Sequence, residues 1–282
     1  MADLSIAKTM SLSGRVGLVT GGGTGIGLSI AKAFAANGAK IYLTGRRLDV
    51  LEKAAASVTG VSGSLVPLQM DATDEESVKA AAKHVGDFDG KLDILVNNAG
   101  FAASRHDPDF LTKKMSANDP FEPETVQNWA DMFALNTITP FFAVRAFQPL
   151  LIQGAHSRLQ GTSSVINISS AAANIQSSSR GLSACLSALN HLTLVLGTSF
   201  ATRDIPIRVN AISPGSFASE LTPPEFLEKL KTTAMPGLVA AVPARRHGSE
   251  AEMGMTAMLL AVSDYTNGVI LRVDGGLSLV NP

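Results

Sequence analysis

A glycine-rich segment near the N-terminus is the first stretch whose residue types suggest chemistry. It reads TGGGTGIG over residues 20–27, directly after a β-branched run and directly before a helical pattern. Glycines in such a turn permit a tight bend, the close approach of a pyrophosphate to the backbone, and close packing of helix on strand, while the helix N-terminus faces the negative charge. The segment therefore predicts a dinucleotide site. Its expected contacts are Gly21, Thr24, Gly25, Ile26 and Gly27.

The end of the next apolar run indicates which dinucleotide would bind. An acidic residue at this point accepts hydrogen bonds from ribose hydroxyls, whereas an arginine pairs with a 2′-phosphate. The chain reads LTGRR, with Arg46 and Arg47 and no carboxylate at Gly45, which predicts NADP(H). Two arginines that merely solvate a helix start are the other interpretation. Asp71 ends the third run, where it would accept from the adenine amine or cap the following helix.

The elements that must position these residues alternate regularly along the chain. Short runs that are apolar on both faces, as buried parallel strands are, alternate with longer helical patterns. The runs span residues 15–20, 40–44, 64–70, 92–97, 163–169, 206–212 and 268–273. They predict an α/β fold: a single doubly wound, Rossmann-like domain over residues 1–282, with a seven-stranded parallel sheet and helices on both faces.

Three segments lie outside this regular alternation. Residues 1–11 form an expected N-terminal tail. The intervals 101–122 and 213–248 are too long for ordinary connections, and both follow strands at the edge of the sheet where ligands bind. They are therefore expected to be substrate-side loops.

Composition narrows the class of partner. The chain has 282 residues, 45% of them hydrophobic, which allows a sizeable core. Lys plus Arg (23) nearly balances Asp plus Glu (24), and no basic cluster exceeds a pair, so neither nucleic acid nor a membrane surface is an expected partner. The single cysteine excludes an internal disulfide framework, and no signal peptide or membrane-spanning stretch is recognised. We expect a cytoplasmic protein that binds a small molecule.

Further motifs follow one another along the chain after the glycine-rich segment. They are LVNNAG (95–100), ALNTITPFF (134–142), VINISSAAA (165–173), RVNAISPGSFAS (208–219) and VDGG (273–276). In this order and spacing the chain resembles the short-chain dehydrogenase/reductase superfamily, and most of all its 3-oxoacyl carrier protein reductase-like branch. The resemblance implies an NADP(H)-dependent oxidoreductase that assembles as a homodimer or homotetramer through the outer faces of two long helices.

The resemblance also assigns roles to residues in these motifs. Asn136 matches the asparagine that holds a water of the proton relay through its helix backbone, and Ser170 matches the serine that orients the substrate carbonyl. The remaining matches would contact the cofactor: Asn98, Ala99 and Gly100 at the adenosine ribose, and Pro214, Gly215 and Ser219 at the nicotinamide and its carboxamide.

The helix after the serine strand departs from the family pattern. Family members carry a tyrosine there and, one turn later, a lysine, because a tyrosine of pKa ~10 is a poor proton donor until an ammonium stabilises its phenolate. In this chain Leu182 and Leu186 occupy the matching positions, and the two tyrosines, Tyr42 and Tyr265, lie elsewhere. Leucines at i and i+4 share one helix face, so they would make a polar catalytic wall apolar. The other interpretation is that they are core residues of a helix that packs on the sheet.

Few side chains are available as substitutes. Cys185 precedes Leu186, although a lone helical cysteine is more often a small buried hydrophobe. Arg180 at the helix start is a possible contact to a substrate oxygen. The loop candidates are Arg105, His106, Asp107 and Asp109, and the other histidines are His84, His156, His191 and His247. None of these residues has metal-ligand spacing, so we expect no catalytic metal.

Several functions remain open on this evidence. The first is a reductase of an imine or activated carbonyl in a small apolar metabolite, since hydride transfer depends strongly on proximity and an iminium needs no proton donor. A non-redox step, such as cyclisation or isomerisation, is possible in the same pocket. The alternatives are a catalytically silent homologue that binds cofactor or stabilises a partner, and a carbonyl reductase or alcohol dehydrogenase with a substitute proton donor.

Overall fold

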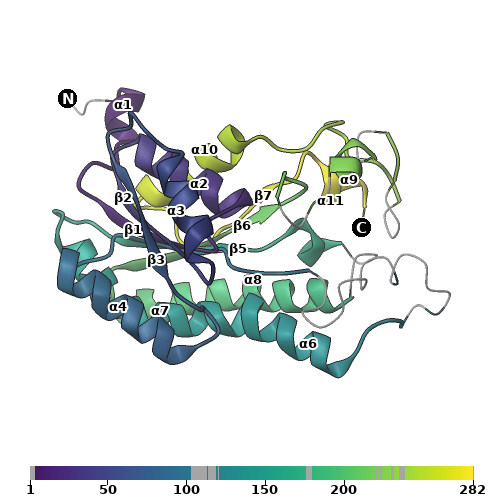
Figure 1. Ribbon diagram of the computed structural model, residues 1–282, viewed down its shortest axis with the longest axis horizontal. Coiled ribbons are helices and arrows are strands. Elements are labelled where there is room, and N and C mark those ends of the chain that lie inside the picture. The colour runs from purple at the N-terminus through teal and green to yellow at the C-terminus, as the bar shows by residue number, and fades with distance from the viewer. Residues whose placement is uncertain are drawn as a thin grey trace.

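Seven parallel strands form the central sheet of the protein (Figure 1). The computed structural model describes residues 4–102, 113, 119, 121–175, 180–219, 222, 224–229, 232–234 and 239–281. The strands are β1 Val16–Thr20, β2 Lys40–Gly45, β3 Ser64–Gln69, β4 Ile94–Asn97, β5 Ser163–Ile168, β6 Ile207–Pro214 and β7 Ile270–Val273. Each overlaps one predicted run, so the predicted α/β fold is confirmed.

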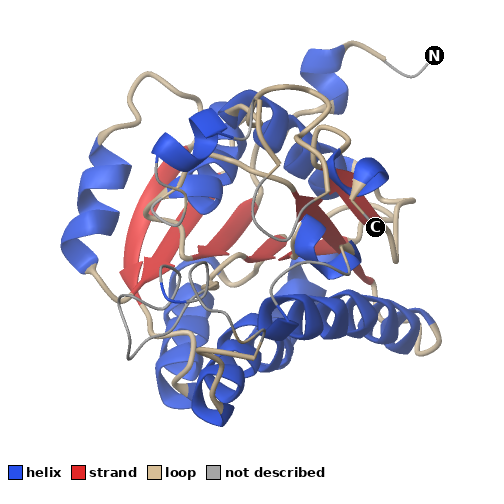
Figure 2. Ribbon diagram, turned by 90° about the vertical axis from the view of Figure 1, so that its right-hand side faces the viewer, coloured by secondary structure: helices blue, strands red, loops and turns tan. Residues whose placement is uncertain are grey.

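Helices cover both faces of this sheet (Figure 2). On one face lie α2 Gly25–Ala36, α3 Leu48–Ala56 and α10 Glu250–Val262, and on the other lie α4 Glu75–Asp89, α7 Thr139–His156 and α8 Arg180–Ala201. Shorter helices are α1 Ile6–Thr9, α6 Val126–Phe133, α9 Pro224–Lys229 and α11 Leu277–Val280, together with the 3₁₀ turn η2 Ala171–Asn174. Helix α1 lies within the predicted N-terminal tail.

The alternation of side chains along each strand explains the two helical layers. Adjacent residues of a strand point to opposite faces of the sheet. In β1, Leu18 packs in the core cluster under α4, α7 and α8, whereas Val19 packs in the cluster under α2, α3 and α10. All five residues of β1 are buried, which is why the sequence reads as a continuous apolar run.

The long helical pattern before β5 is not a single α-helix. Helices α6 and α7 are joined without a break by a π-helical turn, η1, over Ala134–Ile138. Single π-helical turns occur often at functional sites, because the extra residue changes which side chain points inward. Here that side chain is Asn136, which is buried.

Helix α8 corrects one expectation from the sequence. By length and composition it is apolar enough to cross a membrane, contrary to the expectation that no stretch is. Leu196 and Phe200 of α8 pack on the sheet in the same cluster as Leu95 and Val165, and Cys185, Leu186 and Leu189 form a second buried cluster with Met132. Part of the apolar surface of α8 therefore belongs to the protein core.

The strand order places a ligand edge at the middle of the sheet. The order is β3-β2-β1-β4-β5-β6-β7, so the chain reverses its winding direction between β1 and β4. At such a switch point the loops after two neighbouring strands turn to opposite faces of the sheet and leave a crevice at the carboxyl ends. The glycine-rich segment follows β1 and the motif that ends in Gly100 follows β4.

Candidate active site

A cavity of about 610 Å³ opens at the carboxyl ends of the strands, at this switch point. It brings together nearly all of the predicted site residues. Those in its lining are Gly21, Thr24, Gly25, Ile26, Arg46, Arg47, Asp71, Asn98, Ala99, Gly100, Asn136, Ser170, Leu182, Leu186, Pro214, Gly215 and Ser219. Gly27 is the exception, since it is buried within the first turn of α2.

The glycine-rich loop forms the floor of the cavity, and three of its glycines are required by the geometry. Gly21 has φ +61°, and a Cβ at Gly25 would lie 2.8 Å from Cβ of Ser219. A Cβ at Gly27 would lie 2.5 Å from the carbonyl oxygen of Gly21, so this glycine allows packing and does not itself face the cavity. The backbone is thereby left open to a bulky anionic group, as a dinucleotide pyrophosphate requires.

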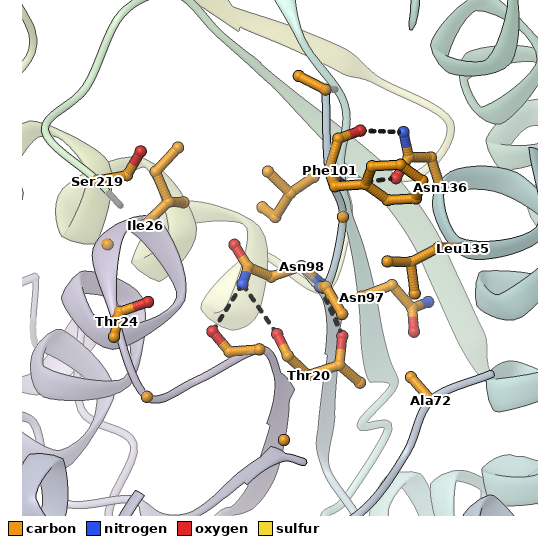
Figure 3. Close-up of a pocket in the computed structure, with 18 of the residues that line it drawn as sticks. Thr20, Thr24, Ile26, Ala72, Asn97, Asn98, Phe101, Leu135, Asn136 and Ser219 are labelled. Carbon is orange, nitrogen blue, oxygen red and sulfur yellow. Dashed lines mark hydrogen bonds between the residues drawn. The ribbon is translucent and has the colours of Figure 1, made fainter. Parts of the chain in front are cut away.

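Hydrogen bonds hold the glycine loop against the loop after β4 (Figure 3). Thr20 Oγ1 accepts from the backbone N–H groups of Asn98 and Ala99, each at 2.9 Å. Asn98 Nδ2 donates to the carbonyls of Thr20 at 2.9 Å and Gly21 at 3.1 Å. The Asn98 side chain therefore supports the loop, in addition to lining the cavity.

The nucleotide end of the cavity carries the charged lining residues. Arg46 and Arg47 are exposed at the end of β2, and Arg47 is the N-cap residue of α3. Asp71 Oδ1 accepts from the Thr73 backbone N–H at 2.9 Å and from its hydroxyl at 2.7 Å. Asp74 caps α4, so the alternative in which Asp71 caps that helix is wrong.

Asn136 connects three segments at the other end of the cavity. Its Oδ1 accepts from the Phe101 backbone N–H at 3.1 Å, and its Nδ2 donates to the Phe101 carbonyl at 2.9 Å. The same Nδ2 lies 3.4 Å from Cys185 Sγ. A Cβ at Gly100 would lie 3.0 Å from Asn136 Oδ1, which explains the glycine at that position.

Ser170 presents a hydroxyl to the cavity directly after β5. Its Oγ accepts from the Ala172 backbone N–H at 3.1 Å, as the N-cap of η2. Because this bond occupies an oxygen lone pair, the hydroxyl proton remains free to be donated to a ligand. The geometry fits a group that holds a substrate oxygen or nitrogen.

Leu182 and Leu186 both line the cavity and make this wall apolar. Leu186 is 5% exposed and packs on Met132, Cys185 and Leu189, and Leu182 packs against the same cluster. Thus the two leucines contact both the cavity and the core beneath it.

The proposed substitutes for a proton donor lie away from this wall or outside the described residues. Cys185 is fully buried and does not line the cavity. Burial raises the pKa of its thiol, and its Sγ lies 3.2 Å from the Leu182 carbonyl. The Arg180 guanidinium lies 5.4 Å from the ring centre of Phe121. Arg105, His106, Asp107 and Asp109 lie outside the described residues.

The histidines form no site in the described part of the chain. The His84 ring lies 4.5 Å from the Phe88 ring between centres, and His156 and His191 are exposed. His247 bonds the carbonyl of Gly248 through its ring. Among the described residues no group of three or more His, Cys, Asp or Glu could hold a metal ion.

The cavity also includes residues that the sequence did not single out. Phe101 lies in the loop after β4, directly after Gly100, and Phe217 lies within the motif that also contains Ser219. Thr222 Oγ1 accepts from the Ser219 backbone N–H at 2.9 Å and donates to the Phe217 carbonyl at 2.6 Å. Phe101 and Phe217 could have been suspected because they lie next to or within predicted motifs. Hydrophobic periodicity does not indicate, however, which way an aromatic side chain in a loop points.

Comparisons with known proteins agree with the motifs. A family model described as short chain dehydrogenase matches residues 15–229. The short-chain dehydrogenase/reductase VdtF of Byssochlamys spectabilis is 32% identical, over 97% of this chain and 95% of that protein. PhomF of Diaporthe leptostromiformis, another short-chain dehydrogenase/reductase, is also 32% identical, over 99% of this chain and 97% of that protein.

A solved structure supports the same relationship. The RhlG/NADP active-site complex of Pseudomonas aeruginosa has a TM-score of 0.80 and 28% sequence identity, and the match covers 96% of this chain and 98% of that one.

Proposed function

Because the chain belongs to the short-chain dehydrogenase family, we propose that it is an NADP(H)-dependent reductase with a non-standard active site. Its substrate is an imine or an activated carbonyl of a small, largely apolar metabolite. One observation carries this proposal: Leu182 and Leu186 line the same cavity as Ser170 and the glycine-rich loop. These leucines stand where the family resemblance places a tyrosine and a lysine.

The cofactor would lie along the floor of the cavity. The glycine loop leaves room for the pyrophosphate, and the two arginines after β2 would pair with a 2′-phosphate. The RhlG complex with NADP supports this choice of dinucleotide. Pro214, Gly215 and Ser219 would hold the nicotinamide end. When bound in its reduced form, the cofactor supplies a hydride.

The residues at the reaction end orient the substrate and exclude water. The Ser170 hydroxyl donates a hydrogen bond to a carbonyl oxygen or a neutral imine nitrogen, and its oxygen accepts one from the N–H of a protonated iminium. Asn136 holds the loop that carries Phe101. Among the described lining residues, Arg46, Arg47 and Asp71 carry charge, and all three belong to the nucleotide end. A substrate that is already cationic, such as an iminium, requires no proton from this wall.

The cofactor part of the proposal is tested by equilibrium titration with NADPH, using NADH as the control ligand. We expect saturable binding with a lower Kd for NADPH, and we expect Arg46→Ala to weaken NADPH binding about tenfold without changing NADH binding. Arg203→Ala, which removes an exposed arginine beyond the end of α8, is the matched control. Absence of binding at millimolar NADPH would contradict the proposal.

The reaction itself is tested by comparing two substrates. A cyclic iminium, such as protonated 3,4-dihydroisoquinoline, should be reduced by NADPH in a single turnover, and acetophenone should react far more slowly. Equal rates for both, or no reduction of the iminium by a protein that binds NADPH, would overturn the proposed substrate class.

A further inference from the structure

Phe101 forms part of the apolar wall at the reaction end of the cavity. It directly follows Gly100 and lines the cavity together with Leu182 and Leu186. The same three side chains pack in one cluster on Met132 and Cys185. Packed side chains of α6 and α8, and not solvent, therefore support this wall from behind.

Asn136 fixes the position of Phe101. Its side-chain amide pairs with both backbone groups of Phe101, at 3.1 Å and 2.9 Å (Figure 3). Asn136 is itself 4% exposed, and the neighbouring Thr137 hydroxyl donates to the Cys185 carbonyl at 2.7 Å. The Phe101 backbone cannot move away without breaking two partly buried hydrogen bonds. The ring is held by its packing on the cluster that contains Met132 and Cys185, so it is in place before a ligand arrives.

The chemistry of this wall favours one class of ligand. An aromatic ring gains an offset-stacked or edge contact with another ring, worth ~0.5–1.5 kcal/mol beyond the area buried. A flat fused ring also has no internal rotations to lose on binding, whereas an alkyl chain of the same carbon number loses several. The leucines at 182 and 186 add apolar contact without imposing charge on the ligand.

We propose that Phe101 is a specificity-determining residue that selects flat ring substrates over open-chain substrates, and that Asn136 is the residue that positions it. The ring of the substrate lies against Phe101, while its oxygen or nitrogen is held by Ser170. This inference rests on the proposed reductase function, since it describes the substrate of the same site.

The test measures binding and not turnover. Two ketones with equal carbon number, 1-tetralone and 2-decanone, are titrated by calorimetry into the protein saturated with NADP⁺, which cannot reduce them. We expect 1-tetralone to bind more tightly. Phe101→Leu should weaken 1-tetralone binding about three- to tenfold and leave 2-decanone binding unchanged. Phe101→Tyr keeps the ring and should keep the preference.

Two further variants separate specificity from general damage. Phe88→Leu makes the same change at a remote side chain on α4 that is 71% exposed, and it should alter neither affinity. Asn136→Ala frees the Phe101 backbone and should lower the preference for 1-tetralone, measured in protein saturated with NADP⁺ so that a change in cofactor affinity does not contribute. A general loss of folding would instead weaken the binding of every ligand, including NADP⁺.

The outcomes distinguish this inference from the proposed function. Tighter binding of 2-decanone, or an equal effect of Phe101→Leu on both ketones, overturns the role of Phe101 even if NADPH binds and an iminium is reduced. If NADP⁺ does not bind, the proposed function fails, and the ketone titrations with the free protein still decide whether Phe101 selects flat rings.

Discussion

The residues at positions 182 and 186 determine whether this wall of the site can donate a proton to the substrate. If they replace a tyrosine and a lysine, the double substitution Leu182→Tyr with Leu186→Lys restores a donor whose phenolate the ammonium stabilises. We expect kcat/KM for simple ketones such as acetophenone to rise by about two orders of magnitude, the lower end for general acid catalysis. Steady-state rates with NADPH measure this.

The matched control introduces side chains of about the size of tyrosine and lysine that cannot donate a proton. Leu182→Phe with Leu186→Met should leave the rate on ketones low. If the folded Tyr/Lys variant reduces ketones no faster than the unsubstituted protein, the site is not merely an impaired ketone reductase, and the search for its chemistry should turn to iminium substrates or to a non-redox step.

Cys185 is predicted to be chemically inert in the folded protein. Burial raises the pKa of its thiol, and the thiolate is the reactive form. Because the folded-state pKa exceeds the unfolded one, the protonated thiol contributes stability that is fully present below the unfolded pKa and is lost as the pH rises through the folded pKa. At pH ~8, iodoacetamide should label the native protein far more slowly than the protein in guanidinium, as followed by mass spectrometry. Equal labelling rates would show that Cys185 is accessible.

Some residues of the site could be predicted from the sequence and others could not. The glycine motif located the phosphate floor, because a backbone that must approach a ligand closely requires glycine whatever surrounds it. The role of Asp71 remained open, and the structure gives helix capping to Asp74. The difference of three positions depends on how the turn after β3 folds, which composition does not determine. The contribution of Phe101 was missed for the same reason.

At the scale of elements, α10 begins with a capping box that should contribute measurably to stability. Ser249 Oγ accepts from the Glu252 backbone N–H at 3.3 Å, and the Glu252 carboxylate accepts from the Ser249 backbone N–H at 2.8 Å. Ser249→Ala removes the first bond, together with the one that the Ser249 hydroxyl donates to Glu252 Oε2 at 2.8 Å, and should lower the free energy of unfolding by about 1 kcal/mol. Urea denaturation followed by the fluorescence of Trp129, the single tryptophan, measures this.

Glu252→Gln is the control for this helix start. A glutamine can complete the same box, so at neutral pH its effect should be smaller than that of Ser249→Ala. The hydrogen bond from Arg246 lowers the pKa of Glu252. A folded-state pKa below the unfolded one contributes stability above the unfolded pKa that is lost as the pH falls, so the variant should be less sensitive to acid. A larger loss in Glu252→Gln than in Ser249→Ala would show that the ion pair, and not the cap, stabilises this end of α10.

Helices and strands were predicted well where a regular pattern of apolar residues marks the buried positions. They were predicted poorly where the local backbone conformation depends on packing against the rest of the protein. Strands such as β1 and β6 are buried on both faces, so their apolar runs identified them. The π-helical turn at Ala134–Ile138 has no such signal, because an extra residue in a helix is stabilised by what surrounds it. Similarly, α8 is apolar enough to resemble a membrane helix until its packing on the sheet is known.

In the molecule as a whole, the order of the strands in the sheet determines where the site lies. The winding reverses between β1 and β4, so the loops after these two strands meet at the crevice, where Asn98 bonds the carbonyls of Thr20 and Gly21. The nucleotide floor and the apolar reaction wall therefore come from loops on the same edge of the sheet but lie at different ends of the cavity. The sequence predicted this edge because parallel strands all end there. It did not predict the shape of the reaction end, since that depends on loop conformation.

We expect the protein to assemble through the layer formed by α7 and α8, which lie together below the sheet in Figure 1. Phe141, Phe142, Leu194 and Val195 are between 37% and 48% exposed on these helices, and the family resemblance implies assembly through the outer faces of two long helices. Leu194→Glu with Val195→Lys should shift the molar mass by light scattering from that of a dimer or tetramer toward that of a smaller species. Leu159→Lys, at a loop residue that is 98% exposed, should leave it unchanged. If the double variant keeps the mass of the unsubstituted protein, the contact lies on another face, and the apolar surface of α7 and α8 serves a different purpose.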